Sequence, residues 1–91
     1  MMRLKPQVTE QQLLEIGFTK LDSGIIHYLM QDELVHIHIL VDLDRTVEFM
    51  VRTKDNYKVM IMDYVLTIIG SFLALVEEFD EKEVYINQYR L

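Results

Sequence analysis

The sequence predicts an α+β domain with a short N-terminal helix, an antiparallel β-meander of four or five strands, and one long apolar helix packed on one sheet face. Three observations predict it. A helix-capping pattern stands near the N-terminus, alternating apolar runs fill the middle, and apolar residues recur at helical spacing toward the C-terminus. The 91 residues suffice for one domain, expected to span 1–91, because a second core would need roughly 50 more. We expect residues 1–7 to be flexible and residues 80–91 to form an acidic tail or an edge strand.

The first helix has a clear start and a clear end. Thr9 is a favourable N-cap, and Gln12 stands three residues later, which is the spacing of a capping box. Gly17 is a natural left-handed stop. The pattern predicts a helix at Glu10–Ile16, too short to persist alone in water. Its apolar residues are expected to dock on the rest of the domain: Leu13, Leu14 and Ile16.

Four runs of strand-forming residues follow this helix, at positions 18–21, 25–30, 34–41 and 47–53. A fifth run at 57–62 predicts either a further strand or the start of the long helix. Because successive side chains of a strand point to opposite faces, the apolar positions of the longer runs define one core face. The opposite face of the sheet is expected to be more polar.

Apolar residues near the C-terminus follow the i, i+3, i+4, i+7 spacing of a helix. They are Val65, Ile68, Ile69, Phe72, Leu75, Val76 and Phe79. The spacing predicts a helix over residues 64–79 that covers the core face of the meander. Its other side carries small residues where a surface helix would carry charges. Gly70 and Ala74, with Ser71 beside them, have a spacing that lets backbones approach closely, which predicts a contact surface and a homo-oligomer, most simply a dimer.

Composition excludes several functional classes. Fifteen acidic and nine basic residues give a net charge of −6, so we expect no direct nucleic-acid binding. The absence of cysteine excludes disulfides and thiolate metal sites. The first residues lack the apolar run of a secretory signal, so a cytoplasmic location is expected. Residues 59–76 are apolar enough for a marginal membrane span, but Asp63 interrupts them and the strands need their cover, so we expect no membrane.

The three histidines are the most chemically distinctive residues of the chain. A two-residue turn at Asp32-Glu33 would place His27 opposite His38 and diagonal to His36, all on the outer face of the sheet. One interpretation is a metal site, because such a cluster can ligate zinc. The interpretation we favour is a semi-polar face, formed by the histidines with Leu29, Leu40, Met50 and Arg52, that is either solvated or covered by a partner protein. Charging of the histidines below about pH 6.5 would then weaken the association.

An acidic segment near the C-terminus supports an alternative hypothesis. Its carboxylates could imitate a phosphate backbone and inhibit a nucleic-acid-binding partner. They are Glu77, Glu78, Asp80, Glu81 and Glu83. Catalytic signatures are missing, since the glycines lie too far apart for a phosphate loop and Ser71 lies in a helical stripe. We therefore expect neither an enzyme nor a cofactor.

The segment Leu13-Leu14-Glu15-Ile16-Gly17-Phe18, followed by strands and a late apolar helix, resembles small uncharacterised proteins of bacterial phages and mobile elements. In those proteins a short helix ending in Gly-Phe leads into a β-meander. The resemblance implies an accessory or interaction protein and carries over no functional residues. The sequence as a whole predicts a non-catalytic protein-interaction domain that self-associates or docks on a partner. The predicted contact residues are Gly70, Ser71, Ala74, His27, His36, His38 and Met50.

Overall fold

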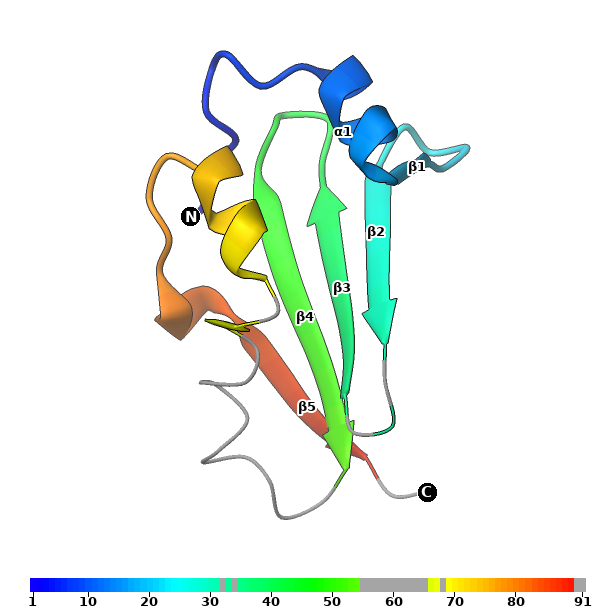
Figure 1. Ribbon diagram of the computed structural model, residues 1–91, viewed down its shortest axis with the longest axis vertical. Coiled ribbons are helices and arrows are strands. Elements are labelled where there is room, and N and C mark those ends of the chain that lie inside the picture. The colour runs from blue at the N-terminus through cyan, green and yellow to red at the C-terminus, as the bar shows by residue number, and fades with distance from the viewer. Residues whose placement is uncertain (32, 34, 55–65, 68, 90–91) are drawn as a thin grey trace.

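The structure is a computed structural model that describes residues 1–31, 33, 35–54, 66–67 and 69–89. It confirms the α+β class, with a short helix and a sheet whose first four strands are antiparallel. The elements in chain order are α1 (Glu10–Ile16), β1 (Thr19–Lys20), β2 (Ile26–Gln31), β3 (Val35–Val41), β4 (Val47–Lys54), the 3-10 helices η1 (Gly70–Leu75) and η2 (Glu81–Glu83), and β5 (Tyr85–Tyr89). Figure 1 shows α1 and η1 on the same face of the sheet, which we name the inner face.

The strands lie in the order β1-β2-β3-β4-β5, so each strand neighbours the one before it in the chain. The edge strand predicted near the C-terminus is present as β5, but it runs parallel to β4 and does not extend the antiparallel meander. A hairpin can produce only antiparallel neighbours, whereas parallel neighbours need a crossover of a dozen or more residues. The chain between Lys54 and Tyr85 is long enough to make that crossover.

The helix α1 begins and ends where the sequence predicts. The Thr9 hydroxyl accepts from the Gln12 backbone N–H at 3.2 Å, and the Gln12 side chain accepts from the Thr9 N–H at 2.8 Å. Gly17 has φ +126°, and a Cβ there would lie 3.1 Å from the Tyr28 ring. Both the backbone conformation and the close ring therefore favour glycine at this stop.

Only one of the three apolar residues of α1 docks on the sheet. Leu13 is 1% exposed, whereas Leu14 and Ile16 are 36% and 46% exposed. Because α1 lies over the β1–β2 side of the sheet, only the side of the helix that carries Leu13 meets the inner face (Figure 1).

The prediction of one long helix over residues 64–79 is wrong from Gly70 onward. Leu66 and Thr67 are α-helical, but Gly70–Leu75 forms the 3-10 helix η1, after which Val76 is extended and pairs with Leu4. A 3-10 helix has three residues per turn, so Ile69, Phe72 and Leu75 share one row. Ile69 and Phe72 are buried and Leu75 is half-buried, so this row covers the inner face as the longer helix was expected to do. Residues 57–62, predicted as a strand or a helix start, lie outside the described residues.

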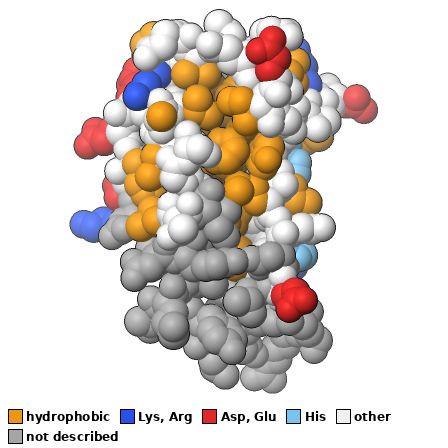
Figure 2. All heavy atoms as spheres, viewed as in Figure 1, with side chains coloured by type: hydrophobic (Ala, Val, Ile, Leu, Met, Phe, Trp, Pro, Cys, Tyr) orange, Lys and Arg blue, Asp and Glu red, His pale blue; other side chains and the backbone are white. Residues whose placement is uncertain are grey.

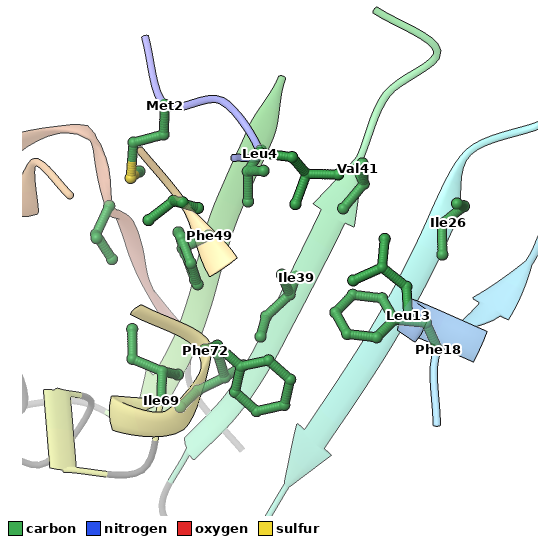
Figure 3. Packing of buried hydrophobic residues seen from close by; sticks show 14 of the residues in the cluster. Met2, Leu4, Leu13, Phe18, Ile26, Ile39, Val41, Phe49, Ile69 and Phe72 are labelled. Atoms are coloured by element: carbon green, nitrogen blue, oxygen red, sulfur yellow. The ribbon is translucent and has the colours of Figure 1, made fainter. Parts of the chain in front are cut away.

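The N-terminal segment 1–7, expected to be flexible, instead completes the core. Met2 and Leu4 are 2% and 5% exposed. The Val47 N–H donates to the Met2 carbonyl at 2.8 Å, and the Leu4 N–H donates to the Arg45 carbonyl at 3.0 Å. In Figure 3 the side chains of this segment, of the α1 region and of η1 converge over the strands. Figure 2 shows hydrophobic side chains gathered between α1 and η1 on this face.

Arg45 joins the β3–β4 turn to the N-terminal segment. Its φ of +72° is in the left-handed region, which glycine adopts more readily than arginine does. Its guanidinium Nη2 donates to the Lys5 and Val8 carbonyls, both at 2.8 Å. These two charge-assisted bonds offset the backbone strain and hold the segment that carries Leu4 against the sheet.

We predict that Arg45→Ala destabilises the fold by about 2 kcal/mol or more, because it loses both hydrogen bonds and keeps the left-handed backbone. Arg45→Gly loses the same bonds but relaxes the backbone, so it should be more stable than Arg45→Ala by about 1 kcal/mol. Urea unfolding of the two variants and the parent chain measures both differences. A glycine variant no more stable than the alanine variant would contradict this account.

Candidate functional site

The face of the sheet opposite α1 and η1, which we name the outer face, is covered by no element that the structure describes (Figure 1). Alternation along the strands buries residues such as Ile37 and Val51 inside and turns their neighbours outward. The outward residues are His27, Leu29 and Gln31 of β2, His36, His38 and Leu40 of β3, and Glu48, Met50 and Arg52 of β4. The three histidines therefore share this face, as predicted.

Strand register arranges these side chains in three rows that cross the sheet. The central row is Leu29, His38, Met50 and, from β5, Tyr85. One flanking row is His27, Leu40 and Glu48, and the other is Gln31, His36 and Arg52. The central row thus has three apolar or aromatic members, and the two charged residues lie one in each flanking row.

The predicted pairing of His27 opposite His38 is wrong by two residues. Leu29 lies opposite His38, and His27 lies opposite Leu40. The reason is the turn: the last pair is Gln31 with His36, so four residues separate the paired positions instead of two. A shift of two residues keeps every side chain on its face, which explains why the face was predicted correctly and the partners were not.

His27 and His38 nevertheless meet diagonally. His27 Nε2 lies 2.9 Å from His38 Nδ1, and the two rings are stacked with centroids 5.1 Å apart. A neutral imidazole has one donor and one acceptor nitrogen, so one ring donates to the other, and which one depends on the tautomers. Two charged rings would both be donors and would lose this bond.

The environment of His38 favours its neutral form. Partial burial lowers the pKa of His38 below its usual value, and the positive charges of His27, His36 and Arg52 lower it further. The flanking Leu29 and Met50 contribute no polar partner that could stabilise the imidazolium. The two side chains are therefore a mutually hydrogen-bonded polar pair, with His38 in the apolar central row and His27 in a flanking row.

The register brings together two histidines and not the three that a zinc site would require. His36 lies two positions along β3 from His38 and pairs with Gln31, at the far end of the face from His27. Over the described ranges, no three histidine, aspartate or glutamate side chains are grouped closely enough to hold a metal ion.

The other predicted contact residues lie elsewhere. Gly70, Ser71 and Ala74 are exposed on η1, over the inner face, so they do not join the histidines in one surface. Positions four apart lie about 120° apart around a 3-10 helix, so Gly70 and Ala74 form no common stripe. A Cβ at Gly70 would meet no atom within 4 Å, so the described fold does not require glycine there for close approach.

The acidic segment lies along the connection from η1 to β5. Glu77, Glu78 and Asp80 are exposed, and η2 carries the remaining two, Glu81 and Glu83. The Glu83 carboxylate is 2.6 Å from the amino group of Met1. This ion pair raises the pKa of the N-terminal ammonium through a hydrogen bond and charge attraction. It also holds Met1 near Val47 and Glu48 of β4.

A cleft of about 450 Å³ opens beside the central row, where β5 pairs with β4 only from Met50 onward. It is lined by Met1, Met2, Val47, Glu48, Phe49, Met50, Glu83 and Tyr85. Met50 and Tyr85 belong both to the cleft and to the central row. A second cleft, of about 330 Å³, lies beside α1 and is lined in part by Glu10, Leu13 and Leu43. The void between α1 and η1 that Leu13, Phe18 and Phe72 line is only about 10 Å³, enough for one water molecule at most.

Sequence reasoning placed Leu29 on the outer face but missed Tyr85 as a member of the site. The signal for Leu29 is strand alternation, which places it between the outward-facing His27 and Gln31. No comparable signal existed for Tyr85, because its place beside Met50 depends on the parallel register of β5.

Comparison of this chain with protein-family models, curated proteins and solved structures finds no match. The resemblance to phage and mobile-element proteins therefore stays a prediction from residues 13–18. Of the helices in the described residues, none has the length and apolar character needed to cross a membrane.

We predict that the free energy of unfolding falls as the pH decreases below about 6.5, the ordinary pKa of histidine. The pKa of His38 is lower in the folded than in the unfolded chain, so acid protonates the unfolded state first and stabilises it. His38→Gln should remove this part of the pH dependence. His36→Gln keeps His38 and removes only one of the lesser causes that lower its pKa, so it should retain most of the dependence. Urea unfolding between pH 5 and 8 measures the slopes, and an unchanged slope in His38→Gln would contradict the assignment.

Proposed function

We propose that the chain is a small, non-catalytic protein-interaction domain and that the outer face is its binding surface. The observation that carries the proposal is the central row, in which Leu29 is 44% exposed and Tyr85 is 60% exposed. Leu29, Met50 and Tyr85 are joined through His38 into a continuous strip across four strands. Contiguous apolar surface with a polar rim is typical of protein-binding sites.

The composition of the outer face also favours protein binding. Methionine, tyrosine and arginine are enriched in protein interfaces, whereas lysine and acidic residues are depleted. The chain has a net charge of −6, yet within the three rows the charges of Glu48 and Arg52 balance each other. A partner surface would meet little net charge here, in contrast to the acidic remainder of the chain.

The histidine pair allows this face to lose water at low cost. A polar group buried without a partner is strongly unfavourable, but His27 and His38 already hydrogen-bond each other at 2.9 Å. Covering the central row would therefore leave this bond in place. The hydrogen bond between His27 and His38 and the apolar side chains of the central row therefore both favour a covered face.

We predict that Leu29→Lys weakens binding at this face about tenfold or more, because it places an unpaired charge in the covered row. Ile16→Lys is the matched control, since Ile16 is exposed to 46% and lies on α1, away from the outer face. A photo-reactive amino acid at position 50, introduced in cells that produce the chain, should form a discrete protein adduct. The adduct should disappear in Leu29→Lys and persist in Ile16→Lys.

Circular dichroism checks that both variants keep the fold, as expected for exposed positions. Mass spectrometry of the adduct identifies whether the crosslinked protein is a second copy of the chain. The proposed function would be wrong if position 50 forms no adduct, or if Leu29→Lys and Ile16→Lys leave the adduct equally strong.

A further inference from the structure

We propose that the partner is a second copy of this chain, an inference that rests on the proposed function. The two copies pack outer face to outer face about a two-fold axis that lies along the central row. The pattern of charge around Met50 carries this inference. Glu48 precedes Met50 by two residues on β4, and Arg52 follows it by two. Both side chains are exposed and point to the outer face, each about 7 Å along the strand from Met50.

A two-fold axis that crosses β4 at Met50, in the plane of contact, reverses the direction of the strand in the second copy. Glu48 of each copy then faces Arg52 of the other, so the dimer holds two Glu48–Arg52 pairs. A two-fold interface requires a self-complementary surface, and the equal spacing of opposite charges about Met50 meets that requirement.

The other residues of the face are compatible with the same axis. The central row lies on its own copy, so Leu29, Met50 and Tyr85 each meet the same side chain of the second copy, and His38 faces His38. The two flanking rows exchange places, which sets Leu40 of one copy over His36 of the other. Apart from His38, the central row therefore joins apolar and aromatic surface, and in the flanking rows the acidic side of the face meets the basic side.

The alternative face-to-face axis, parallel to the strands, fits the charges poorly. It would place Glu48 against Glu48 and Arg52 against Arg52, and such like-charge contacts are costly when water is excluded. Five strands at about 4.8 Å spacing give a face about 19 Å wide, which is small for a stable interface. We therefore expect association in the micromolar range, with the charge pairs fixing the orientation.

The test is sedimentation equilibrium of the purified full chain and of charge-exchange variants. Glu48→Arg alone and Arg52→Glu alone each create two like-charge contacts in a homodimer and should weaken association about tenfold or more. The double variant Glu48→Arg/Arg52→Glu restores opposite charges at both contacts and should dimerise like the parent chain. Glu15→Arg on α1 makes the same charge change away from the face and should leave association unchanged.

A mixture of the two single variants gives the most specific result. In their heterodimer both contacts again join opposite charges, so the mixture should associate where neither variant does alone. Restoration in the mixture occurs between chains, and a change in the stability of either chain cannot produce it. Circular dichroism of each variant confirms that it is folded.

The outcomes separate the two proposals. Single variants that dimerise like Glu15→Arg would overturn the two-fold arrangement. A parent chain that stays monomeric at high micromolar concentration, while position 50 crosslinks to a different protein, would overturn the second copy as partner and leave the proposed function standing. A monomer with no adduct from position 50 would overturn both.

Discussion

The alternation of side chains along the three central strands is the constraint on which the rest of the structure depends. On β3 the inward residues Val35, Ile37, Ile39 and Val41 are between 0% and 3% exposed. A slip of one residue would turn all of them into water, so the core fixes which residues point outward. His36, His38 and Leu40 form part of the outer face because they alternate with this core. The composition of the candidate binding surface thus follows directly from the burial of its neighbours.

The inner face is covered by three short segments that depend on one another. A seven-residue α-helix, a six-residue 3-10 helix and the N-terminal segment are each too short to hold their structure alone. Phe18, Tyr28 and Phe72 link two of these segments, with ring centroids 5.1 to 5.9 Å apart. Arg45 fixes the third through the Lys5 and Val8 carbonyls. All three of these segments pack on the inner face, and none of them contacts the outer face.

What the sequence could predict depends on whether the signal is local. The ends of α1 follow from Thr9, Gln12 and Gly17, which act within one or two turns, and they are correct. Membership of the outer face follows from parity, which an even shift in register does not change. The partner of His38 could not be predicted in this way, because it depends on how many residues the β2–β3 turn uses.

Two larger errors have the same origin. Apolar residues three apart, such as Ile69 and Phe72, lie on one face of both an α-helix and a 3-10 helix, so spacing alone did not distinguish the two. The bridge between Leu4 and Val76 ends the 3-10 helix, and it joins residues 72 positions apart in the sequence. The direction of β5 likewise depends on the crossover that precedes it. Both features come from tertiary contacts that no local pattern contains.

Protonation of His38 links folding to the proposed association, and the two are expected to respond at different pH. The unfolded chain gains its proton near the ordinary histidine pKa of 6.5, so folding begins to lose stability there. The folded, uncovered His38 has a lower pKa, because burial and the charges of His27, His36 and Arg52 oppose its ionisation. Glu48 is the acidic residue of the three rows, and it lies in the flanking row that contains His27. In the proposed dimer, covering the face would remove more water from His38 and set it against His38 of the second copy, and both effects would lower this pKa again. The loss of the proposed association is therefore expected at a lower pH than the loss of folding stability, which begins near 6.5.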